Sequence, residues 1–158
     1  MSLAAPHLTH VADLKVIVGK PIEAGKVVGL NSRGIRRIIP IAGGTITGPL
    51  LNGKILAAGA DFQIIVSETS ADLDARYMIE LDSGEHIFVQ NHALRRGSAE
   101  NIAKLVRGEP ADPAEIYFRC VPTFEVSSLS LQWMTESIFL GTGARFPGHV
   151  FISIYKVE

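Results

Sequence analysis

The chain has 158 residues, of which 47% are hydrophobic and 20% charged, and its formal net charge is −1. This composition excludes a disordered chain, a collagen and a disulfide scaffold, and it is typical of a single globular domain spanning residues 1–158. The balanced charge and the lack of an apolar run of about 20 residues give no indication of a nucleic-acid partner or a membrane span.

Strand patterns dominate the chain from its first third onward. Residues 72–82 show the clearest signal, because Leu73, Tyr77 and Ile79 fall on one face of a period-two pattern and Asp74 and Arg76 on the other. The turn at residues 82–84 makes the next run its hairpin partner. The predicted strands span residues 14–18, 34–41, 64–66, 72–82, 86–91, 116–121, 137–140 and 150–157.

One helix is predicted between residues 98 and 107. Ser98 can cap its start, Ile102 and Leu105 have helical spacing, and Gly108 can end it. A parallel sheet needs a crossover, usually a helix, between its strands, so one helix argues against that architecture. We therefore predict a mainly β fold, an antiparallel barrel of about eight to ten strands with one short helix.

The charges are unevenly distributed. Residues 1–60 carry seven Lys or Arg and two acids, whereas residues 61–94 carry seven acids and Arg76 alone. Opposite charges on neighbouring strands stabilise a sheet, so we expect these two segments to lie side by side. The single cysteine, Cys120, allows no internal disulfide, and the first residues do not resemble a signal peptide. These features predict a cytoplasmic location.

No cofactor motif is complete. Residues 48–54 have the spacing of a phosphate-binding loop, but Ile55 stands where a Ser or Thr is needed, so a turn is expected. The glycines at 141, 143 and 148 miss the dinucleotide fingerprint. His86 and His92 share strand parity without forming a metal-binding motif, so we expect neither a metal nor a cofactor. Cys120 is expected in the core rather than as a nucleophile.

Polar side chains on the predicted strands form the candidate site. If their faces point into the barrel, the arginines can clamp an anion and the acids can shuttle a proton. If the faces point outward, the same groups form surface ion pairs, and the sequence leaves both alternatives open. The candidate catalytic residues are Asp61, Asp74 and Glu125, and the candidate substrate-binding residues are Arg76, Tyr117, Arg119 and Trp133.

Several short motifs, in their order and spacing, resemble a known family. They are the glycines of residues 43–49, Gly59-Ala60-Asp61-Phe62, residues 73–77, Asp82-Ser83-Gly84, Tyr117-Phe118-Arg119, residues 122–125, Trp133-Met134 and residues 150–157. Together they are similar to domain-of-unknown-function family 3237, also called uncharacterised protein family 0311. The resemblance implies an antiparallel β-barrel and implies no particular reaction.

Three positions depart from the family pattern. Cys120 replaces a common Thr, Thr123 replaces an Arg, and Thr135 replaces an Asn. If the Arg and Asn bind substrate in relatives, this chain binds something different or nothing. The Cys120 departure also argues against a thiol mechanism shared across the family.

Three functions are consistent with these observations. The first is a cofactor-independent acid–base enzyme, an isomerase, cyclase or lyase acting on a carbonyl- or carboxylate-bearing small molecule. The second is a non-catalytic ligand-binding barrel. The third is an oligomerising interaction module, since a mean hydropathy of +0.25 indicates apolar surface that a homo-oligomer would bury.

Overall fold

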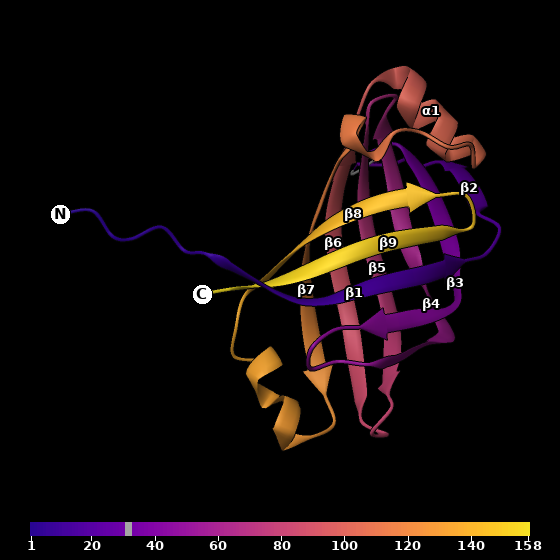
Figure 1. Ribbon diagram of the computed structural model, residues 1–158. Helices are drawn as coiled ribbons and strands as arrows, with labels where there is room; N and C mark the ends of the chain where they lie inside the picture. Colours follow the sequence, from indigo (N-terminus) through magenta and orange to yellow (C-terminus); the bar gives the residue numbers. More distant parts are fainter. Residues whose placement is uncertain (31–32) are drawn as a thin grey trace.

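Nine antiparallel strands are present in the computed structural model, which describes residues 1–30 and 33–158 (Figure 1). In chain order the strands are β1 (Leu8–Val18), β2 (Ile22–Lys26), β3 (Ile35–Thr47), β4 (Gly53–Ser67), β5 (Ser70–Leu81), β6 (His86–Arg96), β7 (Tyr117–Val126), β8 (Phe139–Phe146) and β9 (His149–Val157). The helices are α1 (Ala99–Arg107) and two short 3₁₀ helices, η1 (Pro113–Glu115) and η2 (Leu129–Met134).

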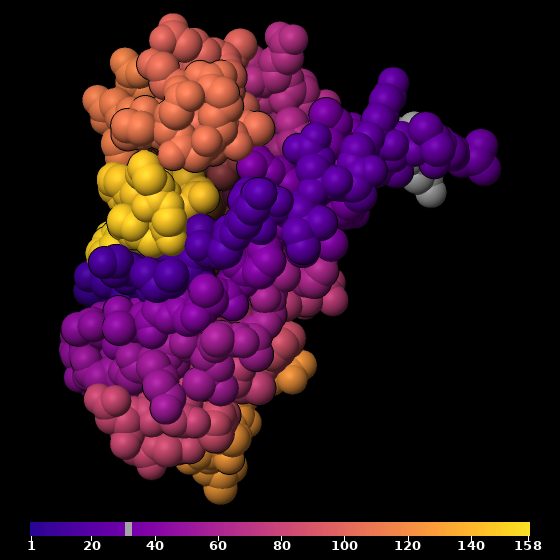
Figure 2. Space-filling view, turned by 90° about the vertical axis from the view of Figure 1, so that its right-hand side faces the viewer, coloured from indigo at the N-terminus to yellow at the C-terminus, as the bar shows by residue number. Residues whose placement is uncertain are grey.

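Eight of the strands close into a barrel. Each strand from β3 to β9 pairs with its neighbours in the chain, and β1 closes the ring by pairing with β9 on one side and β3 on the other. The remaining strand, β2, pairs only with β3, and its segment projects from the barrel wall (Figure 2). The predicted antiparallel barrel of eight to ten strands with one helix is confirmed.

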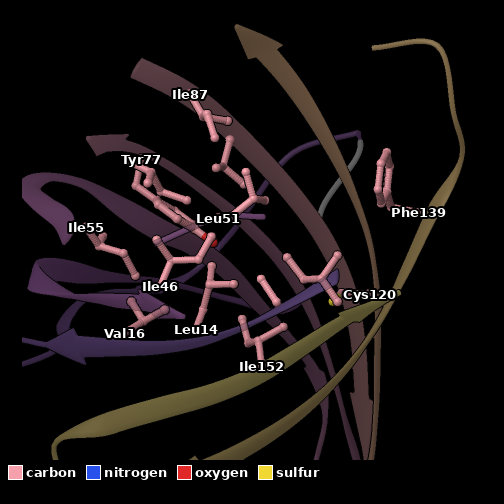
Figure 3. Packing of buried hydrophobic residues seen from close by; sticks show 14 of the residues in the cluster. Leu14, Val16, Ile46, Leu51, Ile55, Tyr77, Ile87, Cys120, Phe139 and Ile152 are labelled. Atoms are coloured by element: carbon pink, nitrogen blue, oxygen red, sulfur yellow. The ribbon is translucent and has the colours of Figure 1, made fainter. Parts of the chain in front are cut away.

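Alternation along the strands produces the core. On β5, the side chains separate onto two faces as the period-two pattern predicts, and the structure shows that the face of Leu73, Tyr77 and Ile79 is buried while Asp74 and Arg76 lie outside. Inward side chains from all eight strands of the barrel meet in one apolar cluster (Figure 3). Burying apolar surface stabilises the closed barrel by roughly 25 cal/mol for each Å² removed from water.

Strands β3 and β4 run much further than the sequence indicated. A strand was predicted only at residues 34–41 in the region of β3 and only at residues 64–66 in the region of β4, but both strands continue through their glycines. Gly44 and Gly59 have φ of 142° and 120° at bulges, where an added Cβ would lie 2.1 Å from a neighbouring carbonyl oxygen. Glycine is therefore the residue that lets these strands bend without ending.

Different elements cover the two ends of the barrel. Helix α1 lies at one end and η2 at the other (Figure 1). The predicted helix is confirmed: Ser98 accepts a hydrogen bond from the Asn101 backbone, and Gly108 ends the helix with a left-handed φ of 78°. The 3₁₀ helix η2 was not predicted. No helix in the described ranges combines the length and apolar character that crossing a bilayer requires.

One seam of the barrel is weakly paired. Strand β7 pairs with β8 only at Arg119 with Thr142 and at Cys120 with Gly141, whereas every other adjacent pair in the ring shares at least six partners. The predicted charge complementarity appears elsewhere on the wall: Lys54 pairs with Glu80 at 2.8 Å, and Arg33 pairs with Asp72.

Candidate functional site

The barrel interior contains a cavity of about 40 Å³ at the end near α1. Arg95, on the strand that leads into α1, lines it. One bound water occupies roughly 10–15 Å³ of such cavity volume. The cavity is therefore large enough for about three waters or a few atoms of a ligand. Most of its wall is apolar and comes from Val16, Val18, Ile39, Ile41, Val150 and Ile152.

Six polar side chains interrupt this apolar wall. They are Asp61 and Gln63 from β4, Tyr77 from β5, Asn91 and Arg95 from β6, and Arg145 from β8. Ala75 pairs in register with Asp61 on one side and with Asn91 on the other. Because the alanine side chain is short, the space between these two polar groups stays open.

Unpaired buried polar atoms gather at this cavity. Six side-chain atoms are buried without a hydrogen-bond partner in the described part of the chain: Arg37 Nε, Asp61 Oδ1, Gln63 Oε1, Tyr77 Oη, Asn91 Oδ1 and Arg95 Nε. Five of them belong to residues that line the cavity, and Arg37 is the register partner of Gln63. Since most buried polar groups in proteins are paired, such a cluster indicates a site that a polar ligand or ordered water completes.

Asp61 is the acid of this site. Gln63 Nε2 donates to Asp61 Oδ2 at 2.6 Å, while Oδ1 is shut off from solvent although the residue as a whole is only partly buried. Burial raises the pKa of the Asp61 carboxyl above its ordinary value, against the opposing influence of the Gln63 hydrogen bond and the charge of Arg95. A carboxyl that holds its proton to higher pH is suited to donate and accept protons.

Two guanidinium groups, of Arg95 and Arg145, line the cavity with this acid, and that of Arg37 lies beside it as the register partner of Gln63. Burial lowers the pKa of Arg37, Arg95 and Arg145, and the three cations also repel one another. For Arg95, which is 3% exposed, the pKa falls to about 10. Within the described residues none of the three forms an ion pair with Asp61. The interior is thus electropositive at this end.

Two further groups keep their protons. Burial raises the pKa of the Tyr77 hydroxyl, which therefore stays a hydrogen-bond donor at neutral pH. Burial also raises the pKa of the Cys120 thiol to about 11, although the Asn91 side chain bonds to it. Cys120 is 2% exposed, so the expectation of a core cysteine is confirmed. A thiol with this pKa is a poor nucleophile.

Only one of the seven predicted site residues lies in the cavity, and it is Asp61. Asp74 and Arg76 form a surface ion pair at 2.9 Å on the outer face of β5. Tyr117 and Arg119 lie on the outer face of β7, where the Arg119 guanidinium stacks 5.2 Å from the Tyr117 ring. For these four residues the structure shows side chains that point outward, which is the second of the two alternatives left open by the sequence.

The remaining two predicted residues lie elsewhere on the barrel. Glu125 is exposed on β7. Trp133 is a partly buried residue of η2, at the end opposite α1, and its ring lies 6.0 Å from that of Phe139. The structure does not bring these residues together with Asp61.

The other polar residues in and beside the cavity were not predicted from the sequence. Their signal was a polar residue at an inward position of an apolar strand: Arg37 alternates with Ile35 and Ile39, and Tyr77 falls on the apolar face of β5. His86 and His92 point outward, 3.2 Å from Glu80 and Asp72. In the ranges 1–30 and 33–158, no three His, Cys, Asp or Glu side chains are grouped to hold a metal ion.

Known proteins resemble this chain over nearly its full length. A UPF0311 protein of Bradyrhizobium diazoefficiens is 41% identical over 152 residues, which cover 95% of this chain and 99% of the relative. A UPF0311 protein of Rhodopseudomonas palustris is 39% identical over 148 residues, 94% of each chain.

Solved structures share the fold. A conserved protein of unknown function from Rhodopseudomonas palustris aligns with a TM-score of 0.91 at 37% identity, covering 99% of this chain and all of that one. A structure described as an enzyme from Penicillium herquei aligns with a TM-score of 0.70 at 18% identity, covering 100% of this chain and 98% of that one, which shows the fold alone. The family model described as protein of unknown function (DUF3237) matches residues 6–157. The chain therefore belongs to the DUF3237 family of small β-barrel proteins.

Proposed function

We propose that the protein binds a small carbonyl- or carboxylate-bearing molecule inside the barrel and acts on it by cofactor-independent acid–base chemistry. The observation that carries this proposal is the cluster of unpaired buried polar atoms around one cavity. Isomerases, cyclases and lyases include reactions that general acid–base catalysis promotes without a cofactor.

Each polar group has a role that its chemistry allows. Asp61, with its raised pKa, donates or accepts the proton. The Tyr77 hydroxyl donates to an oxygen on which negative charge develops, and the unpaired Asn91 Oδ1 accepts from a ligand hydroxyl. The apolar wall lowers the local dielectric, which strengthens each of these interactions.

A non-catalytic binding barrel is the second candidate. It is favoured by the mainly apolar wall and by the hydrogen bond that already engages Asp61 Oδ2. In this case Asp61 orients Gln63 and transfers no proton.

Binding to a second copy of the chain remains a separate proposal. The exposed side chains of Leu94, Val121 and Leu140 line a groove over the β7–β8 seam. Apolar surface of this kind favours self-association. Light scattering at micromolar concentration tests it, and a strict monomer contradicts it.

A thermal-shift screen against small carboxylates and carbonyl compounds is the first experiment. A ligand that binds only the folded state stabilises it by about 2.7 kcal/mol at a hundredfold excess over Kd. Candidate ligands are then incubated with the wild type, Asp61→Asn and the outward control Asp74→Asn, and conversion is followed by mass spectrometry. Loss of conversion with retained binding in Asp61→Asn alone supports the enzyme. Binding without conversion in all three supports the binding barrel.

A further inference from the structure

Arg95 and Arg145 line the cavity and Arg37 lies beside it, and the three differ in their hydrogen-bond partners. Arg37 Nη2 donates to the Val106 carbonyl of α1 at 2.8 Å, and Glu23 favours its charged form from β2. Arg145 Nη1 donates to the carbonyls of Phe146 and His149 at 2.6 and 3.0 Å. Both side chains are therefore held by hydrogen bonds to backbone carbonyls.

Arg95 is the exception. Its side chain is 3% exposed, its Nε is buried without a partner, and no hydrogen bond joins its guanidinium to another described residue. Burying a cation in this way is costly unless something pairs with it. The five N–H donors of a guanidinium fit a carboxylate with two parallel hydrogen bonds.

The charges of the described interior groups do not balance. Even with Asp61 ionised and Glu23 beside Arg37, the three guanidinium groups keep at least one positive charge in excess. An anionic group on a ligand offsets it. A neutral carbonyl compound would leave Arg95 as a buried cation beside Arg145.

The apolar part of the cavity determines the polarity and size of the rest of the ligand. Val16, Ile39, Ile41 and Ile152 offer no hydrogen bonds, and the volume of about 40 Å³ admits only a short chain. Resting on the proposed function, we infer that the ligand is a short-chain carboxylate anion, whose carboxylate binds Arg95 and whose apolar body packs against this wall.

The test uses isobutyrate and its neutral amide, isobutyramide, as probes, at equal ionic strength. Arg95→Met keeps the length and packing of the side chain while removing its charge and donors. The matched control is Arg96→Met, because Arg96 is adjacent on β6 but points outward and stacks 4.9 Å from the Tyr117 ring. Arg95→Lys keeps the charge without the paired donors.

Isobutyrate is expected to raise the Tm of the wild type and Arg96→Met by several degrees, and isobutyramide is not. Titration calorimetry should show roughly 10- to 100-fold weaker isobutyrate binding to Arg95→Met, the loss typical of a charge-assisted hydrogen bond, with partial recovery in Arg95→Lys. Without ligand, Arg95→Met should melt at or above the wild-type temperature, because it removes an unpaired buried cation.

Three results overturn the inference. They are equal binding of isobutyrate and isobutyramide, equal isobutyrate binding by the wild type and Arg95→Met, and no stabilisation of the wild type by isobutyrate. Binding of isobutyramide or another neutral compound that Tyr77→Phe weakens would still support the proposed function. Failure of the anion inference and failure of interior binding are thus distinguished.

Discussion

Replacing Tyr77 with Phe is the most direct test of the unpaired polar cluster. Tyr77 is 2% exposed, and its hydroxyl is buried without a partner among the described residues. An unsatisfied buried hydroxyl costs about 1–3 kcal/mol, and Phe keeps the ring and its packing. We expect Tyr77→Phe to stabilise the ligand-free protein by about that amount, and to raise the Tm by about 2–4 °C for each kcal/mol in a chain of this size.

The same substitution should weaken ligand binding, because the hydroxyl that destabilises the empty barrel is the one offered to a ligand. Urea unfolding gives the free energy, and calorimetry with a ligand from the screen gives the affinity. Tyr117→Phe is the matched control: Tyr117 is 41% exposed, so its stability should change by less than about 0.5 kcal/mol. A loss of stability of 1 kcal/mol or more in Tyr77→Phe would refute the reasoning, because it would mean that a fixed water or other partner satisfies the hydroxyl.

Four further predictions test other parts of the structure. Burial raises the pKa of the Cys120 thiol from 9.0 to about 11, so the folded state binds this proton more tightly than the unfolded state. The free energy of unfolding of the wild type should therefore fall by about 2–3 kcal/mol more than that of Cys120→Ala as the pH rises from 9 to 11. Urea unfolding measures this difference. Gly59→Ala should destabilise by about 2–3 kcal/mol, because its Cβ would meet the Arg76 carbonyl, whereas Gly84→Ala, with positive φ but open space, should cost about 1 kcal/mol. Ser98→Ala should cost about 1 kcal/mol by removing the α1 cap, and amide exchange of Asn101 should quicken. Asp74→Asn should change stability by less than about 1 kcal/mol and leave ligand affinity unchanged, since its ion pair is exposed; a tenfold loss of affinity would place the site on the outer face instead.

The fold was predictable because its signals are local. Each signal depends on residues only a few positions apart in the sequence. Examples are the alternation on β5, the turn at residues 82–84 and the two caps of α1. The extents of β3 and β4 were not predictable. Whether Gly44 or Gly59 ends a strand or bends it depends on how closely a neighbouring strand approaches, and Lys15, the neighbour of Gly44, lies on β1.

The site was harder to predict for a related reason. Period two shows which side chains share a face, and the structure shows that the apolar face of β5 points inward. The obvious acid–arginine pairs therefore became surface ion pairs, as Asp74 and Arg76 did. The interior polar groups are isolated among apolar neighbours, and Arg95 lies near enough to feel the charge of Asp61 only because β4, β5 and β6 lie side by side.

Closure of the ring by β1 affects the order of folding. Asp13 on β1 accepts a hydrogen bond from Ser153 on β9, 140 residues further along the chain. The hairpins from β3 to β7 pair near neighbours and can form early, whereas this contact must close a long loop. The cavity includes Val16 of β1 and Ile152 of β9, so it exists only after that last step. A ligand bound there should slow unfolding and leave the folding rate unchanged.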